Sequence, residues 1–228
     1  MPVNKDPREA LSPRIRSHRT FISNHRMNPH WQELADAVGR DGEEAVLELL
    51  DHPKTKYTNV GDLVAATKHI TAKSLVSLWG NPKADKRNIN HLAEAAKSCG
   101  VDEIRKMMNH HKATTYNLFN LSQAATKCGL GEVWHLLDHK MSTPNNLVDF
   151  AAMAGAGDLE PAKMALEFAK RPTEAEPIAR TLQEQVRVLT FNDPKKIHAL
   201  QWKFIRHDHM PTTEGIKMLV KAKGHKWL

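Results

Sequence analysis

The sequence feature that most constrains the fold is a large apolar residue that returns every 29 positions. It occupies five successive places, at Leu34, Leu63, Leu92, Leu121 and Phe150. Apolar columns three residues before this position, and twelve and sixteen residues after it, keep the same register, and small residues recur four residues after it. Agreement between several columns over five copies indicates an internal repeat.

Each copy has the pattern of two short helices. In the third copy, Ile89, Leu92 and Ala96 have the spacing of an apolar stripe on a first helix. Asn88 precedes this stripe, and we expect its side chain to cap the helix by accepting a hydrogen bond from a first-turn amide. Gly100 is expected to end the first helix in a left-handed conformation, and a second helix follows. Helices of about ten residues are marginal alone, so neighbouring copies must stabilise one another.

Two parts of the pattern resemble known repeats. The inter-helix turn and second helix at residues 99–104 and 128–133 resemble the corresponding part of ankyrin repeats. The Thr-Pro-Leu-His start and the β-hairpin of that family are absent, and the period is shorter than its ~33 residues. Residues 146–166 look like a pentatricopeptide hairpin, a family with a longer period. The resemblance covers residues 31–170 and is to the class of helical-hairpin repeats, so no family's functional residues are carried over.

We therefore predict an all-α fold, an α-solenoid of five 29-residue helix-turn-helix repeats over residues 30–170. Residues 1–29 contain several prolines and scattered arginines, and are expected to form a basic extended arm with a short helical piece near residues 20–26. A proline-containing stretch at residues 171–177 interrupts the pattern. Residues 171–228 are expected to form a helical capping module with a basic surface, because terminal repeats need a polar outer face.

The net charge of +7 comes from the two ends of the chain. Residues 1–30 carry six Lys and Arg against two Asp and Glu, residues 31–170 sixteen against eighteen, and residues 171–228 eleven against six. Nucleic-acid binding needs clustered Lys and Arg, so the predicted phosphate contacts lie in the ends. They are Arg14, Arg16, Arg19, Arg26, Lys195, Lys196, Lys203 and Arg206. The alternative interpretation is a solvated basic face that only aids solubility.

The first helices do not carry a code for bases. Repeat proteins that read RNA use two or three polar side chains per unit. Here positions one and two after the recurring Leu, which we expect to be exposed, hold small or acidic residues such as Ala93 and Glu94. Such a surface suits protein partners. Trp134 is the predicted protein-interface residue because Trp is common among interface hot spots, whereas Trp79 lies in an apolar column and is expected to be internal.

No catalytic, cofactor-binding or metal-binding residue is predicted. His135 and His139 have the spacing of two metal ligands on one helix, but no further ligand stands at a diagnostic spacing. Cys99 and Cys128 occupy equivalent positions in adjacent copies, where we expect buried thiols too far apart for a disulfide. Phosphate-binding glycine loops and nucleophile motifs are also lacking. We therefore expect neither an enzyme nor a small-molecule substrate.

The predicted function is a non-catalytic scaffold subunit that docks protein partners through the repeats and anchors through its basic ends. The charge distribution favours a large ribonucleoprotein assembly, such as an organellar ribosome or an RNA-processing complex. Two alternatives stay open, namely a protein adaptor or effector without RNA, and direct RNA binding by the repeats.

Composition also bears on the compartment. Two cysteines predict a reducing compartment, and the lack of an apolar run of ~18 residues predicts no membrane partner. The Arg and Ser content of the first residues resembles a mitochondrial presequence, although Asp6 and Glu9 are unusual for one.

Overall fold

The structure is a computed structural model that describes residues 6–21, 30–157, 159–169 and 171–180. Every regular element among these residues is a helix, and the described part contains no strand. The predicted all-helical fold class is therefore confirmed. The chain divides into two compact units, Met1–Ser122 and Gln123–Leu228, and each is described by itself.

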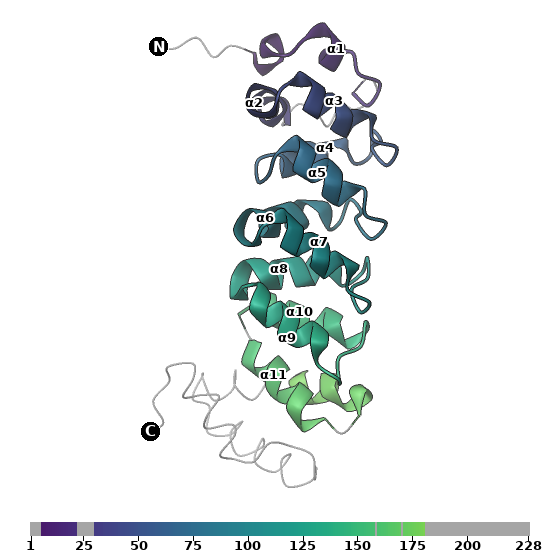
Figure 1. Cartoon of the computed structure of the whole chain (residues 1–228), viewed down its shortest axis with the longest axis vertical. Helices are drawn as coiled ribbons and strands as arrows, with labels where there is room; N and C mark the ends of the chain where they lie inside the picture. The colour runs from purple at the N-terminus through teal and green to yellow at the C-terminus, as the bar shows by residue number, and fades with distance from the viewer. Residues whose placement is uncertain (1–5, 22–29, 158, 170, 181–228) are drawn as a thin grey trace, which may run out of the picture. The chain divides into compact units, whose positions relative to one another are not determined.

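The first unit begins with two short helices, η1 (Pro7–Ala10) and α1 (Pro13–Arg16). Three helical hairpins follow. They are α2 (Trp31–Asp41) with α3 (Glu43–Asp51), α4 (Val60–Ala66) with α5 (Ala72–Trp79), and α6 (Ile89–Cys99) with α7 (Val101–Asn109). Figure 1 shows these hairpins one after another, with the loops that join successive hairpins on the same side.

The division between the units falls inside α8 (Leu118–Cys128). After this helix, the second unit continues with α9 (Leu130–Asp138) and with the hairpin of α10 (Asn146–Gly155) and α11 (Leu159–Phe168). A further helix begins at residue 172 and is described as far as residue 180. The other residues of the predicted capping module, 181–228, lie outside the described part.

The columns of the 29-residue register are buried. Leu34 is 1 % exposed, and Leu63, Leu92, Leu121 and Phe150 are fully buried. The column sixteen residues later is also internal, and it consists of Leu50, Trp79, Met108, Leu137 and Leu166. This burial stabilises helices as short as the seven residues of α4, which would not persist alone.

Glycines with a positive φ separate the two helices in α2–α3, α6–α7, α8–α9 and α10–α11. They are Gly42, Gly100, Gly129 and Gly157, with φ angles of 87°, 92°, 90° and 91°. Gly100 thus has the positive φ expected of it, but its ψ of 143° lies outside the left-handed helical region. The α4–α5 connection is built differently, because Thr71 at the equivalent position has an extended backbone and its hydroxyl accepts a hydrogen bond from Ser74 N at 3.2 Å.

The recurring asparagine before the first helix of a hairpin does not cap that helix. The side chain of Asn88 is buried and makes no capping hydrogen bond. It closes the preceding loop, since Nδ2 donates to Lys83 O at 3.0 Å and Oδ1 accepts from Asp85 N at 2.8 Å. The same pair of hydrogen bonds, at the same spacing, is made by Asn59, Asn117 and Asn146. The predicted cap is wrong because the upstream loop turns back and presents one N–H and one C=O, which an amide satisfies together.

Residues 6–21, expected to lie in an extended arm, are partly helical and pack on the first hairpin. Leu11, Ile15 and Phe21 are buried in one cluster with Leu34 and Val46 of α2 and α3. Periodicity did not reveal this packing because three apolar residues are too few to define a period.

Replacing Asn88 with Ala is expected to lower the free energy of unfolding by about 2 kcal/mol, because two buried backbone groups would lose their partner. Asn90→Ala is the matched control. The Oδ1 atom of Asn90 is buried without a hydrogen-bond partner, so its removal should change the free energy by less than about 0.5 kcal/mol. Urea unfolding followed by circular dichroism measures both variants, and equal losses would contradict the role of Asn88.

Candidate protein and nucleic-acid interfaces

The loops that join one hairpin to the next carry a recurring set of polar side chains. In the first unit these inter-hairpin loops comprise residues 52–59, 81–88 and 110–117. Each begins with His or Asn just after a second helix, has a Lys two residues later and ends with the buried Asn. The loops are therefore ordered by side chains that the 29-residue register repeats.

The first side chain of each inter-hairpin loop accepts a hydrogen bond from the N–H of the lysine two residues later. The acceptors are Nδ1 of His52 at 3.2 Å, Oδ1 of Asn81 at 2.9 Å and Nδ1 of His110 at 3.2 Å. In the second unit His139 Nδ1 accepts in the same way at 3.2 Å. An imidazole nitrogen accepts only when it is unprotonated, so these turns require Nδ1 without a proton.

The lysine of the loop reaches the next hairpin. Lys54 Nζ donates to three carbonyl oxygens at and beyond the C-terminal end of α5. These are Trp79 O at 3.0 Å, Asn81 O at 2.7 Å and Ala84 O at 2.9 Å. Lys83 Nζ likewise donates to two carbonyl oxygens at the end of α7, both at 2.8 Å. The ammonium group supplies donors and positive charge where a helix end carries unpaired carbonyls and partial negative charge.

The partial burial of these loop side chains shifts their pKa values. Burial lowers the pKa of Lys54 and the pKa of Lys83, because desolvation disfavours the charged ammonium form. Burial, with the nearby charge of Lys54, also lowers the pKa of His52. This shift favours the neutral imidazole that the acceptor role requires.

The predicted nucleic-acid-binding residues fall partly in the described region. Arg14, Arg16 and Arg19 are exposed on and just after α1. Arg14 Nη1 lies 2.7 Å from a carboxylate oxygen of Glu44 on α3, which offsets part of the positive charge. The remaining predicted contacts, Arg26, Lys195, Lys196, Lys203 and Arg206, lie outside the described residues.

The two tryptophans singled out by sequence differ in exposure. Trp79 is 2 % exposed, and its Nε1 donates to Thr55 Oγ1 at 3.2 Å, so the expected internal position is confirmed. Trp134 is half-buried on α9. The structure therefore leaves part of the Trp134 side chain accessible to a partner.

Positions one and two after the recurring Leu are not equally exposed, contrary to the prediction. At position one, Val64 and Ala93 in the first unit and Ala151 in the second are fully buried. A small residue there allows α4 and α6 to pack on one another. At position two, Asp36 is exposed and Glu94 is half-buried. Of the two positions, the second is therefore the more accessible to a ligand.

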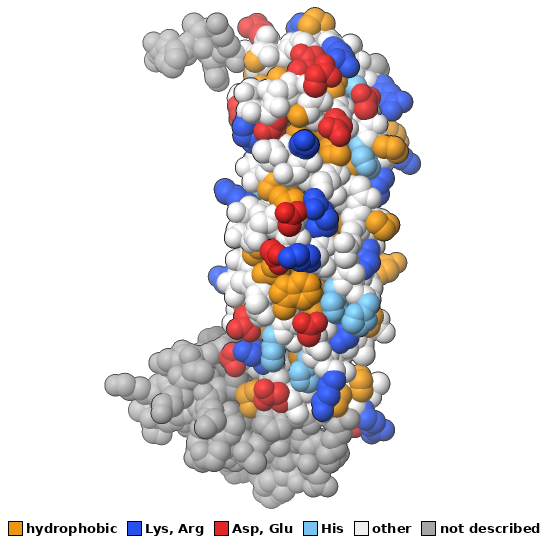
Figure 2. All heavy atoms as spheres, in the orientation of Figure 1, with side chains coloured by type: hydrophobic (Ala, Val, Ile, Leu, Met, Phe, Trp, Pro, Cys, Tyr) orange, Lys and Arg blue, Asp and Glu red, His pale blue; other side chains and the backbone are white. Residues whose placement is uncertain are grey.

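Sequence analysis overlooked the basic residues of the inter-hairpin loops. The three loops of the first unit carry six Lys and Arg against one Asp. On the edge of the first unit where these loops lie, Figure 2 shows basic and hydrophobic side chains projecting from the surface. The net charge of a whole segment hides this excess of Lys and Arg, whereas the net charge of each column of the 29-residue register shows it.

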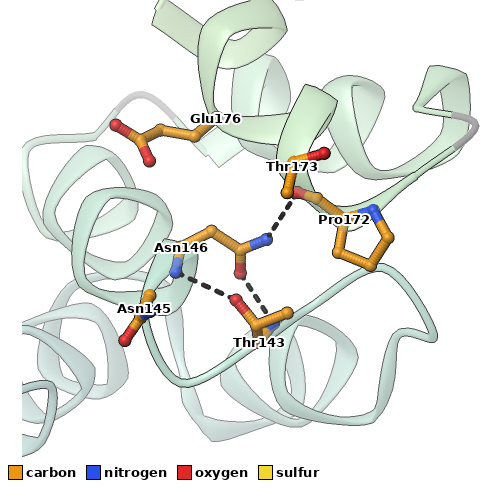
Figure 3. A pocket seen from close by; sticks show the side chains of 6 residues that line it. All are labelled: Thr143, Asn145, Asn146, Pro172, Thr173 and Glu176. Atoms are coloured by element: carbon orange, nitrogen blue, oxygen red, sulfur yellow. Dashed lines mark hydrogen bonds between the residues drawn. The ribbon is translucent and has the colours of Figure 1, made fainter.

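The second unit has an open polar pocket of about 350 Å³. Its lining residues are Thr143, Asn145, Asn146, Pro172, Thr173 and Glu176. Figure 3 shows Asn146 between Thr143 and Pro172, and its Nδ2 donates to Pro172 O at 3.3 Å. The pocket therefore lies where a buried loop asparagine reaches the following loop.

The described residues form neither a metal-binding cluster nor a membrane-spanning helix. No group of three or more His, Cys, Asp or Glu side chains there is placed to hold a metal ion, and no helix there has the length and apolarity to cross a membrane. Cys99 and Cys128 form no disulfide with any described residue, as expected, but they are half-buried rather than buried. Partial burial raises the pKa of the Cys128 thiol.

Comparison with known protein families, with curated proteins and with solved structures finds no match to this chain. The likeness to ankyrin and pentatricopeptide hairpins rests on sequence pattern alone. Functional inference therefore starts from the geometry of the chain itself.

Lys54→Met is expected to lower the free energy of unfolding by about 2 kcal/mol, because the end of α5 would lose its charged hydrogen-bond donor. Met keeps most of the apolar stem of the lysine. Lys56→Met is the matched control, since Lys56 is exposed two residues away and its loss should cost less than about 0.5 kcal/mol. Thermal and urea unfolding compare the two, and an equal effect would contradict the bridging role.

The lowered pKa of His52 predicts a pH dependence of stability. Between that pKa and the ordinary value of 6.5, the unfolded chain binds more protons, so stability should fall as the pH decreases through this window. His52→Asn installs the acceptor that Asn81 already provides in the next loop. The variant should lose less stability between about pH 7 and pH 5 than the parent. Urea unfolding of the parent and of the variant at both pH values measures the two losses of stability. Equal losses would refute the acceptor role of the His52 imidazole.

Proposed function

We propose that this chain is a non-catalytic scaffold subunit whose hairpins form a five-repeat α-solenoid over residues 30–170. The observation that supports this proposal most directly is the lysine bridge, in which Lys54 and Lys83 each bond to the backbone of the following hairpin. A unit that stabilises its neighbour in the same way at successive steps is typical of repeat arrays, in which each repeat contacts only its neighbours.

In this proposal the repeats dock protein partners. Stacked hairpins present an extended concave surface of the kind that repeat proteins use for binding. The burial of position one leaves few side chains per first helix for reading bases, which favours protein over RNA as the ligand of that surface. Trp134 is the proposed anchor, since it is half-buried and Trp is common among hot spots.

The basic ends anchor the scaffold to RNA in the same assembly. The exposed positions of Arg14, Arg16 and Arg19 support this role, because phosphate contacts need accessible positive charge. A ribonucleoprotein such as an organellar ribosome or an RNA-processing complex would offer both the protein and the RNA surface. No catalytic step is assigned to the chain.

A tagged full-length chain purified from its native source, with and without nuclease, tests this function. We expect a set of ribonucleoprotein partners that is released by nuclease. Changing Lys195, Lys196 and Lys203 to Ala should weaken the association and its salt dependence, whereas the same change at the exposed Lys73, Lys97 and Lys127 should not. Trp134→Ala should release protein partners without reducing the RNA recovered.

Recovery of a stable protein set that survives nuclease and contains no RNA would overturn the ribonucleoprotein assignment and favour a protein adaptor. Unchanged partners in the Trp134→Ala sample would remove Trp134 from the interface.

A further inference from the structure

We propose that the outer side of the inter-hairpin loops in the first unit binds single-stranded nucleic acid without regard to base sequence. This surface, the loop ridge, consists of the exposed side chains of Lys56, Tyr57, Lys86, Arg87 and Tyr116. The loop ridge is distinct from the basic ends named above. The inference rests on the proposed function only in that the chain works beside RNA.

The loop ridge is continuous because hydrogen bonds join each of its three loops to the next. Lys54 Nζ in the first loop donates to Ala84 O in the second at 2.9 Å. Asn88 Nδ2 in the second loop donates to Thr115 O in the third at 3.3 Å. Figure 1 shows the three loops on one side of the first unit. A ligand strand can therefore pass from one loop to its neighbour.

Positive charge in the first unit is concentrated in these loops. They hold six Lys and Arg against one Asp, whereas the rest of residues 1–122 holds twelve Lys and Arg against thirteen Asp and Glu. Lys54 and Lys83 are directed to backbone carbonyls, but Lys56 and Lys86 are exposed and have no ion pair with any described residue. These two ammonium groups are available to phosphates, whose neutralisation dominates nucleic-acid affinity.

The loop ridge also carries the large apolar side chains that are most exposed among the described residues. Tyr57 is 59 % exposed and Tyr116 is 76 % exposed. The Arg87 guanidinium lies 5.5 Å from the centroid of the Tyr116 ring and also pairs with Asp85 at 2.6 Å. Surfaces that bind single strands combine a basic track with aromatic rings on which bases stack, and guanidinium groups add cation–π contacts.

The order of the side chains favours nucleic acid over an acidic protein segment. Tyr57 and Tyr116 lie in the outer two loops, and Lys86 with Arg87 lies between them. An acidic peptide would be attracted by the charge alone. A strand of bases and phosphates uses the rings and the charges together, because every base has a face that stacks.

The test is binding of the purified full chain to a fluorescent oligouridine of about 20 nucleotides, longer than the sites such surfaces cover. Fluorescence anisotropy at several salt concentrations gives the affinity and its salt slope. The double variant Lys56→Ala with Lys86→Ala should bind about tenfold more weakly, with a slope smaller by about 1.4. Lys68→Ala with Lys97→Ala removes the same charge from exposed positions outside the three loops and should stay within about twofold of the parent.

The tyrosines are tested in the same assay. Tyr57→Ala with Tyr116→Ala should lose about thirtyfold or more in affinity, whereas Tyr57→Phe with Tyr116→Phe keeps the rings and should retain binding. Thermal unfolding of each variant checks that the fold is kept.

Three results would overturn this inference. The first is failure of the parent chain to bind oligouridine at low salt. The second is oligouridine binding that the loop-ridge variants keep but that the variant with Lys195, Lys196 and Lys203 changed to Ala loses. That result would assign the nucleic-acid contacts to the basic ends, as in the proposed function. The third is competition by polyglutamate as strong as by RNA, with no effect of the tyrosine-to-alanine changes, which would assign the loop ridge to an acidic protein.

Discussion

The hairpins of the first unit depend on a lysine ammonium group that binds the carbonyl end of a neighbouring helix. The helices are short, with seven residues in α4 and eight in α5, so their own hydrogen bonds do not stabilise them sufficiently. Lys54 bonds to three carbonyl oxygens and lies 5.0 Å from the ring centroid of Trp79. Its lowered pKa records the cost of burying the charge, and the hydrogen bonds and the helix dipole offset that cost.

The other loop side chains put the lysine in position. The acceptor at the start of the loop fixes the turn that contains the lysine N–H, and the asparagine at the end ties the loop to the following helix. In the second unit, Met141 occupies the place of the lysine, and Asn146 reaches a carbonyl of the next loop, as Asn88 does in the first unit. Cohesion between successive loops is thus kept by the asparagine where the lysine is lacking.

Sequence periodicity predicted the parts of the fold that burial controls. The recurring Leu positions are buried and Gly100 has a positive φ, because a helix must bury one stripe and end in a conformation that glycine adopts. The role of Asn88 was predicted wrongly, since a pattern shows that an amide recurs but not which backbone groups face it. Lys54 was overlooked because lysine is mostly found in solvent.

The candidate site residues could likewise be predicted only in part from the sequence. Segment charge pointed to the ends, where Arg14, Arg16 and Arg19 are exposed. The net charge of the middle segment combines the basic inter-hairpin loops with the acidic residues of the helices between them. The basic loops were therefore missed. Trp134 was found because its type is informative by itself, but its partial burial depends on packing that no local pattern specifies.

The loops separate the needs of folding from those of binding. Their inward positions hold an acceptor, a lysine and an asparagine in each loop. The acceptor and the asparagine bond to backbone at fixed places, and so do the lysines of the first two loops. Their outward positions hold Lys56-Tyr57, Lys86-Arg87 and Thr115-Tyr116. An exposed tyrosine contributes little to packing, and the exposed Lys56 and Lys86 have no ion pair with any described residue. The fold does not require this outward chemistry, so its concentration on one edge is best explained by an anionic ligand with aromatic faces.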